Sequence, residues 1–177
     1  MNIVAMPEYE ISGNVCSQLQ GLLEECFPDT FEGRTYFKQL PHLRLLAMDA
    51  GLVVGQVGID GRVVNVGGTV ISIFGRIDLA VHPGSRGRRI GTMLLGHAER
   101  FARAWNRDFL VLMADRHDLY LREGYSRVQP AHTRWLAIDN RQSVEVIERD
   151  LGNCFMVKSL IDREWPEGTI DMLGYLF

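Results

Sequence analysis

The sequence predicts an α/β fold in which a run of antiparallel strands leads into a strand, a glycine-rich turn and a helix. The apolar run Ile77–Val81 indicates a strand that stops at His82, because Pro83 cannot donate to a sheet. Apolar residues then recur every three or four positions from residue 90 to residue 105, which is typical of an amphipathic helix (Ile90, Leu94, Ala98, Phe101, Ala102, Trp105). Between residues 42 and 76, apolar runs are separated by glycine turns, which favours hairpins.

The elements before this turn follow from spacing and from turn residues. Residues 2–5 indicate a strand, and helical spacing from Ile11 predicts a helix that Ser12 or Asn14 caps and Pro28 ends. Residues 31–40 predict a second, shorter helix. Strands are expected at 42–48, 52–59, 63–66 and 69–74, joined by turns at 49–51, 60–61 and 67–68.

The elements after the helix alternate between strands and short helices. The apolar run 109–114 predicts a strand, and a helix around Tyr120 follows it. Strands are expected at 124–128, 133–138 and 154–160, with a short helix at 143–149. At 177 residues with 46% apolar side chains, the chain suits one domain, residues 1–177.

The turn after Val81 combines glycines with arginines at the start of a helix. The first N–H groups of a helix lack partners within it, and three arginines add full positive charges (Arg86, Arg88, Arg89). A pyrophosphate fits this chemistry, although solvated arginines on a plain connection fit the pattern equally well. Two known phosphate loops are excluded, because Gly91 is followed by Thr92 rather than Lys and no G-x-G-x-x-G pattern occurs.

The segment from Val81 to Gly91 resembles the coenzyme A loop of the GNAT N-acetyltransferases, whose pattern is Q/R-x-x-G-x-G/A. Arg86 fits its first position and Gly91 its last, whereas Arg89 stands where the family usually has glycine. The resemblance implies that acetyl-CoA is the cofactor. The residues that it implies for binding are Leu79, Ala80, Val81, Arg86, Gly87, Arg88, Arg89, Ile90, Gly91 and Thr92.

A second segment resembles the same family. Residues 118–125 match its F/L-Y-x-x-x-G-F/Y pattern, with Tyr120 four residues before Gly124. Together the two segments imply the GNAT fold, an α/β fold whose mixed, mostly antiparallel central sheet is flanked by helices on both faces. They also imply acetyl transfer from acetyl-CoA to a primary amine, directly and without a covalent acyl-enzyme.

This reaction needs a base for the amine, donors for the oxyanion and an acid for the leaving thiolate. A tyrosine phenol is protonated at neutral pH, so Tyr120 is the candidate acid unless it only packs against the sheet. Asp78 is the candidate base, and the alternative is that Asp78 is only a structural partner of Arg76 or of a helix. Three further side chains are candidates for holding a water molecule (His82, Asp115, His117), and a backbone N–H of the strand 77–81 suits the oxyanion.

The acceptor is predicted from charge and from the end of the chain. From Asp139 onward there are eight acidic side chains against four basic ones, which favours a cationic small-molecule amine or is only a solvated surface. The end around Trp165 is loosely similar to aminoglycoside 2′-N-acetyltransferases, which suggests an aminoglycoside. The alternatives are a protein or peptide N-acetyltransferase, a longer-chain acyl donor, and a non-catalytic coenzyme A or acyl-ligand binding domain.

Composition excludes several other classes. The net charge of −3 and the pI near 5.9 argue against nucleic acid as a partner. No stretch approaches the ~20 apolar residues of a membrane span, and no secretory signal is visible, so a cytoplasmic protein without a membrane partner is expected. Three scattered cysteines form neither a disulfide framework nor a metal motif. The sequence itself leaves the oligomeric state open, and the family resemblance alone suggests a homodimer.

Overall fold

The computed structural model describes residues 1–177 and divides into two compact units. The first unit comprises residues 1–60 and 76–101, and the second comprises residues 61–75 and 102–177. Two long strands, β3 (Leu52–Val66) and β4 (Thr69–Val81), each contribute residues to both units. None of the helices is long and apolar enough to cross a lipid bilayer.

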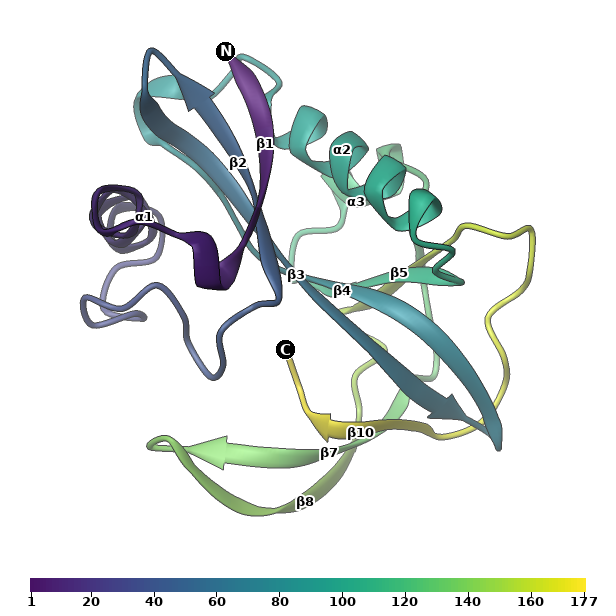
Figure 1. The fold of residues 1–177 in the computed structure, drawn as a ribbon. Helices are drawn as coiled ribbons and strands as arrows, with labels where there is room; N and C mark the ends of the chain where they lie inside the picture. The colour runs from purple at the N-terminus through teal and green to yellow at the C-terminus, as the bar shows by residue number, and fades with distance from the viewer. The chain divides into compact units, whose positions relative to one another are not determined.

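The first unit begins with three antiparallel strands (Figure 1). β1 (Asn2–Pro7) pairs with β2 (Leu43–Asp49), which pairs with β3. Between β1 and β2 lie the short 3-10 helix η1 (Glu8–Glu10) and the helix α1 (Gly13–Cys26). The side chain of Ser12 caps α1, because its Oγ accepts the N–H of Val15, which confirms one of the two predicted caps. After β4 come the 3-10 helix η2 (Pro83–Ser85) and the helix α2 (Ile90–Ala104).

The two helices of this unit pack on opposite faces of its strands. Met48 pairs with Val53 and Ala47 with Gly55, so a bulge at Val54 reverses the alternation of β3. Val53 therefore faces the same side as Leu46, where both pack against α1. Gly55 faces the other side, where a Cβ would lie 3.0 Å from Cγ2 of Ile90 on α2.

The second unit holds the remaining strands. They are β5 (Phe109–Met113), β6 (Ser126–Arg127), β7 (His132–Asp139), β8 (Gln142–Asp150), β9 (Phe155–Ser159) and β10 (Ile170–Tyr175). The strand order is β6-β9-β5-β4-β3-β10-β7-β8, and only the β4–β5 and β10–β7 pairs are parallel. The short helix α3 (Asp118–Arg122) follows β5. The predicted α/β fold with a mixed, mostly antiparallel sheet and helices on both faces is confirmed.

The short helix predicted for residues 31–40 is wrong. This segment contains no helix, because Glu32 and Gly33 both adopt left-handed backbone conformations that an α-helix cannot contain. Phe31 is instead buried in the apolar cluster beneath α1. Tertiary packing therefore decides the path of this segment.

The hairpin predicted at Asp60-Gly61 is also wrong, because β3 continues without a turn to Val66. Asp60 is buried, and its carboxylate lies 2.8 Å from Nδ1 of His42. A Cβ on Gly61 would lie 2.8 Å from Cε1 of Phe74, so this glycine allows an aromatic ring to approach the strand closely. β4 likewise runs unbroken through Gly75, where separate strands were expected.

Two further predictions fail near the surface. Residues 143–149 belong to β8 rather than to a helix, because Asn140 and Arg141 adopt left-handed conformations that make a tight hairpin with β7. Trp105 follows the last residue of α2 and is 60% exposed, so it is not part of the buried stripe. β10 lies in a tail for which no strand was expected.

Candidate active site

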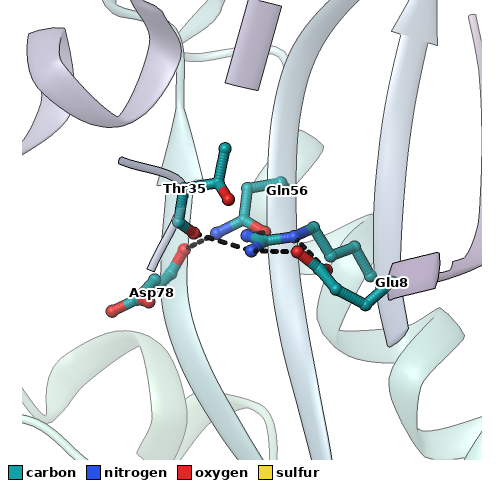
Figure 2. A network of polar contacts seen from close by, with 5 residues as sticks. Glu8, Thr35, Gln56 and Asp78 are labelled. Carbon is teal, nitrogen blue, oxygen red and sulfur yellow. Dashed lines mark hydrogen bonds and ion pairs between the residues drawn. The ribbon is translucent and has the colours of Figure 1, made fainter. Parts of the chain in front are cut away.

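A buried arginine is the centre of the polar network in the first unit (Figure 2). Arg44 lies on β2 and is 1% exposed. Its Nε and Nη2 donate to the two carboxylate oxygens of Glu8 at 2.7 and 3.1 Å. Nη2 also donates to the main-chain oxygen of Thr35 at 2.6 Å, and Nη1 donates to Oε1 of Gln56 at 3.2 Å. The bidentate contact with Glu8 compensates the charge that burial would otherwise penalise.

Gln56 carries this network from Arg44 to β4. Its side chain lies on β3, is fully buried, and accepts from Arg44 through Oε1. Because an arginine only donates, the amide nitrogen must face the other way. There Nε2 donates to the main-chain oxygen of Asp78, as Figure 2 shows.

Asp78 interrupts the regular backbone of β4. Its φ of 51° lies in the left-handed region, which costs a non-glycine residue about 1–2 kcal/mol. As a result, Ile77 and Ala80 both face the α1 side of the strands: Ile77 packs beside Gly58, the register partner of Arg44, and Ala80 packs in the cluster beneath α1. The side chains around Asp78 therefore do not alternate between the two faces as they do in a regular strand.

The environment of Asp78 changes its protonation. Burial raises the pKa of Asp78 to about 6, while the positive charges of Arg44 and Lys38 act in the opposite direction. Burial also lowers the pKa of Lys38, and the Asp78 carboxylate opposes that shift. A carboxyl group with a pKa near 6 is ionised at neutral pH and is a stronger proton acceptor than an ordinary aspartate. The alternative partner, Arg76, is buried and donates to the main-chain oxygen of Leu95 in α2 at 2.9 Å.

The turn between β4 and α2 has the geometry of an open cradle. Gly87 and Arg89 adopt left-handed conformations with φ of 79° and 59°, and nothing lies within 4 Å of a Cβ built on Gly87. The main-chain oxygen of Arg89 accepts the N–H of Met93, so the helical hydrogen bonds begin there. The N–H groups of Ile90, Gly91 and Thr92 therefore belong to the first turn, which has no carbonyl partners within the helix.

Two of the three arginines in this turn already have protein contacts. Nε of Arg86 donates to the main-chain oxygen of Val81 at 3.2 Å, and that oxygen also accepts from the thiol of Cys26 at 3.4 Å. Arg88 forms an ion pair with Asp49 at 2.8 Å. Arg89 is exposed and forms no ion pair. The turn thus offers three cations, with Arg89 fully available and Arg88 shared with a carboxylate.

Tyr120 and the other candidate side chains are divided between the two compact units. Tyr120 lies on α3 in the second unit, where its ring packs edge-on against Tyr125 with a centroid distance of 5.9 Å. His117 also lies in the second unit, and its Nε2 is buried without a hydrogen-bond partner. His82 belongs to the first unit, where Nδ1 accepts the N–H of Gly84 and Nε2 faces Glu25 at 3.0 Å. Asp115 is exposed.

The acidic tail lies in the second unit. Trp165 and Glu167 line a pocket of about 520 Å³ together with Arg127 and His132. Asp171 lies 3.9 Å from Arg134 and accepts the N–H of Leu173. Part of the tail's charge is therefore used within the unit, and its contact with an acceptor stays a prediction.

The buried network was not predicted from the sequence. Arg44 lies between Leu43 and Leu45, and Gln56 lies in the apolar run that begins at Val53. A polar residue inside an apolar strand was the available signal, because burial of such a group requires a partner. Neither Glu8 nor Thr35 carries any such signal.

The comparisons with known proteins define the class. The family model for the acetyltransferase (GNAT) domain matches residues 13–128, which is more than half of the chain. The chain therefore belongs to the GNAT acetyltransferase family and is an acyltransferase by class. A comparison with curated protein sequences found no match.

Solved structures share the fold along nearly the whole chain. The GNAT family N-acetyltransferase YhbS from Escherichia coli, solved with CoA, has a TM-score of 0.68 and 20% identity over 97% of this chain and 89% of its own. A GNAT family acetyltransferase from Brucella melitensis, solved with acetyl-CoA, has a TM-score of 0.62 and 17% identity over 96% and 94%. An aminoglycoside 6′-acetyltransferase type Ii has a TM-score of 0.61 and 20% identity over 93% and 100%. At these identities the likeness concerns the fold.

Proposed function

We propose that this protein is an acetyl-CoA-dependent N-acetyltransferase that acts on a primary amine of a small molecule by direct acyl transfer. The observation that carries the proposal is the strand, turn and helix from Asp78 to Thr92. It places a carboxyl group with a raised pKa on the strand that leads into an open, cationic helix N-terminus. The complexes of the bacterial neighbours with CoA and acetyl-CoA support the choice of cofactor.

The residues of the turn fit a pyrophosphate. The space beside Gly87 is open, the guanidinium groups of Arg86, Arg88 and Arg89 are exposed, and the first N–H groups of α2 are the donors that a helix offers to anions. We assign the binding of acetyl-CoA to this turn, with the adjoining end of β4 (Leu79, Ala80, Val81). Acetyl-CoA supplies the acetyl group as a thioester. Its binding to this protein is testable by calorimetric titration.

The proton transfers are assigned to two side chains. Asp78, ionised above a pH of about 6, accepts the proton that the acceptor amine must lose before it attacks. Tyr120 donates a proton to the sulfur that leaves, so the amine gains the acetyl group and the thiol is released neutral. The role of Tyr120 rests on the sequence resemblance, and Tyr120→Phe tests it. We expect Tyr120→Phe to lower kcat about 100-fold and to leave affinity for CoA unchanged.

For the acceptor we propose a small cationic amine, with aminoglycosides as the first compounds to test. The similarity to an aminoglycoside 6′-acetyltransferase supports this choice, as does the acidic end of the chain. The decisive experiment combines calorimetric titration of acetyl-CoA with a thiol-release assay over a panel of amines. Binding together with release on one amine supports the proposal. Binding without release on any amine favours a non-catalytic acyl-ligand domain, and the absence of binding contradicts the assignment of the turn.

A loop variant separates the cofactor site from the rest of the protein. Gly91→Trp introduces a large ring into the first turn of α2 and should weaken acetyl-CoA binding at least about tenfold, because it blocks approach to the backbone. Gly13→Trp is the matched control, since a Cβ at the start of α1 meets nothing within 4 Å. Equal affinity of Gly91→Trp and wild type would refute the loop assignment.

A further inference from the structure

The network around Arg44 contains two buried polar side chains to which the proposed reaction gives no task. Arg44 is 1% exposed and Gln56 is fully buried, although both lie on strands that are otherwise apolar. Apolar residues of similar volume are often as stabilising as a buried ion pair, or more so. Stability alone is therefore a weak reason for a polar chain at this place. The hydrogen bonds of this network also constrain the backbone at Asp78.

The direction of the network is fixed by the chemistry of its members. Arg44 donates at every nitrogen, so the side chain of Gln56 must present Oε1 to it and Nε2 to the main-chain oxygen of Asp78. Rotation of this amide by 180° would bring two donors together on one side and two acceptors together on the other. Gln56 therefore holds the Asp78 carbonyl in a single orientation.

The backbone at Asp78 needs such a contact. A left-handed residue in the middle of a strand turns its carbonyl away from the regular direction of the ladder. This conformation persists only where the surroundings enforce it. The side chain of Gln56, reaching across from β3, supplies a bond to this carbonyl and thereby holds the backbone from which the Asp78 carboxylate projects.

A second branch of the network reaches the irregular segment before β2. The same guanidinium donates to the main-chain oxygen of Thr35, and Lys38 lies three residues further along. The charge of Lys38 acts on Asp78, and that of Asp78 acts on Lys38. Arg44 thus links the segment that carries Lys38 to the strand that carries Asp78.

We infer that Arg44 and Gln56 are positioning residues that hold the backbone of β4 at Asp78. The inference rests on the proposed role of Asp78 as the base. Gln56 from β3 bonds the main-chain oxygen of Asp78, and the charges of Arg44 from β2 and Lys38 from the irregular segment act on the Asp78 carboxyl group. Loss of the Gln56 contact releases the Asp78 carbonyl, and the affinity for acetyl-CoA reports separately on the cationic turn.

The test uses Gln56→Glu and Gln56→Leu in the full chain. The glutamate keeps an acceptor for Arg44 but has no N–H for the Asp78 carbonyl, and the leucine removes both contacts. We expect kcat to fall about 10- to 100-fold in both variants, with the affinity for acetyl-CoA unchanged, because a displacement of about 1 Å in a catalytic group has that effect. Gln18→Leu is the matched control, since Gln18 also bonds to β3, at the N–H of Val53, but does not contact Asp78.

A second readout does not depend on turnover. The carboxyl carbon of Asp78, assigned by comparison with Asp78→Asn, is titrated by NMR in wild type, Gln56→Glu, Gln56→Leu and Gln18→Leu. A changed Asp78 titration in both Gln56 variants and an unchanged one in Gln18→Leu support the inference. Identical titration curves in all four proteins overturn it, even where kcat falls. If the wild type binds acetyl-CoA but acetylates no amine, the proposed function fails and the titration still decides the positioning.

Discussion

At the scale of single residues, Asp78 combines two properties that oppose each other. A carboxyl group whose pKa is raised by burial is harder to ionise in the folded chain than in the unfolded one. The folded state therefore binds more protons between a pH of about 4 and a pH of about 6, so this group lowers stability as pH rises through that window. The property that makes Asp78 a good base thus destabilises the protein at neutral pH.

Replacement of Asp78 by asparagine should separate activity from stability. We expect Asp78→Asn to lose at least about 100-fold in kcat, since it cannot accept a proton. Its melting temperature should exceed that of the wild type at pH 8, and this difference should shrink or vanish at pH 4, where the wild-type carboxyl is already neutral. Thermal unfolding at the two pH values measures this. A difference that is the same at both pH values would contradict the assigned pKa.

Arg89 is the residue at which this sequence departs from the family pattern, and its backbone explains why glycine is usual there. Its φ of 59° is a conformation that glycine adopts freely and that costs other residues about 1–2 kcal/mol. The extra guanidinium therefore comes with local strain. An arginine in place of glycine at this position is favourable only where its charge contributes to binding, as it would beside a pyrophosphate.

Two variants test this balance. Arg89→Gly should stabilise the fold by about 1 kcal/mol or less, because the relief of strain is partly offset by the freedom of glycine in the unfolded chain. It should also weaken acetyl-CoA binding about tenfold through the loss of a charge. Arg89→Lys keeps both charge and strain, so it should match the wild type in melting temperature. If Arg89→Gly binds acetyl-CoA as tightly as the wild type, Arg89 has no role in binding.

The ion pair between Arg88 and Asp49 predicts a competition. An anion that binds Arg88 must share it with the Asp49 carboxylate, 2.8 Å away, and Arg88 lowers the pKa of that carboxyl. We therefore expect Asp49→Asn to bind acetyl-CoA more tightly than the wild type, by a few-fold at low ionic strength, with the gain disappearing at high salt. Titrations at two salt concentrations measure this. Weaker binding in the variant would show that the ion pair instead orders the turn.

At the scale of elements, tertiary packing in β3 outweighs a local sequence signal for a turn. Asp60-Gly61 is a strong hairpin signal, yet Asp60 is buried against His42 and Gly61 lies under the ring of Phe74. Gly61→Ala should therefore destabilise the fold by about 1–3 kcal/mol, because the new methyl group would lie 2.8 Å from the Phe74 ring. Gly13→Ala meets nothing and is the control. Chemical denaturation of both variants decides whether Gly61 is a turn residue or a close-packing residue.

The sequence predicted the elements whose signals are local. α1, α2 and the strand that stops before Pro83 follow from periodicity, from Ser12 and from Pro83, and the structure confirms them. The helix expected at 31–40 and the helix expected at 143–149 failed, because Phe31 packs into a distant cluster and β8 forms by pairing with β7. The links from Arg44 to Glu8, Thr35 and Gln56 join residues far apart in the chain, so no local pattern could reveal them.

At the scale of the whole molecule, the two compact units share both of their longest strands. β3 and β4 pass from one unit to the other without interruption, so neither unit can unfold without breaking a strand that the other uses. We therefore expect a single calorimetric transition in which the calorimetric and van't Hoff enthalpies agree, as for a single domain over residues 1–177. Two resolved transitions would show two separate folding units.

The edge of the sheet in the second unit bears on how copies of the protein meet. β8 is the last strand in the order, and Val144 and Val146 on it are 60% and 55% exposed. An open edge with apolar side chains invites another chain to add a strand, and charged side chains are the usual defence. Glu148 shares the face of β8 that carries these valines and Glu145 lies on the other face, so a second copy at this edge would bring like charges together. The two glutamates thus place negative charge along an edge that would otherwise favour the addition of a strand.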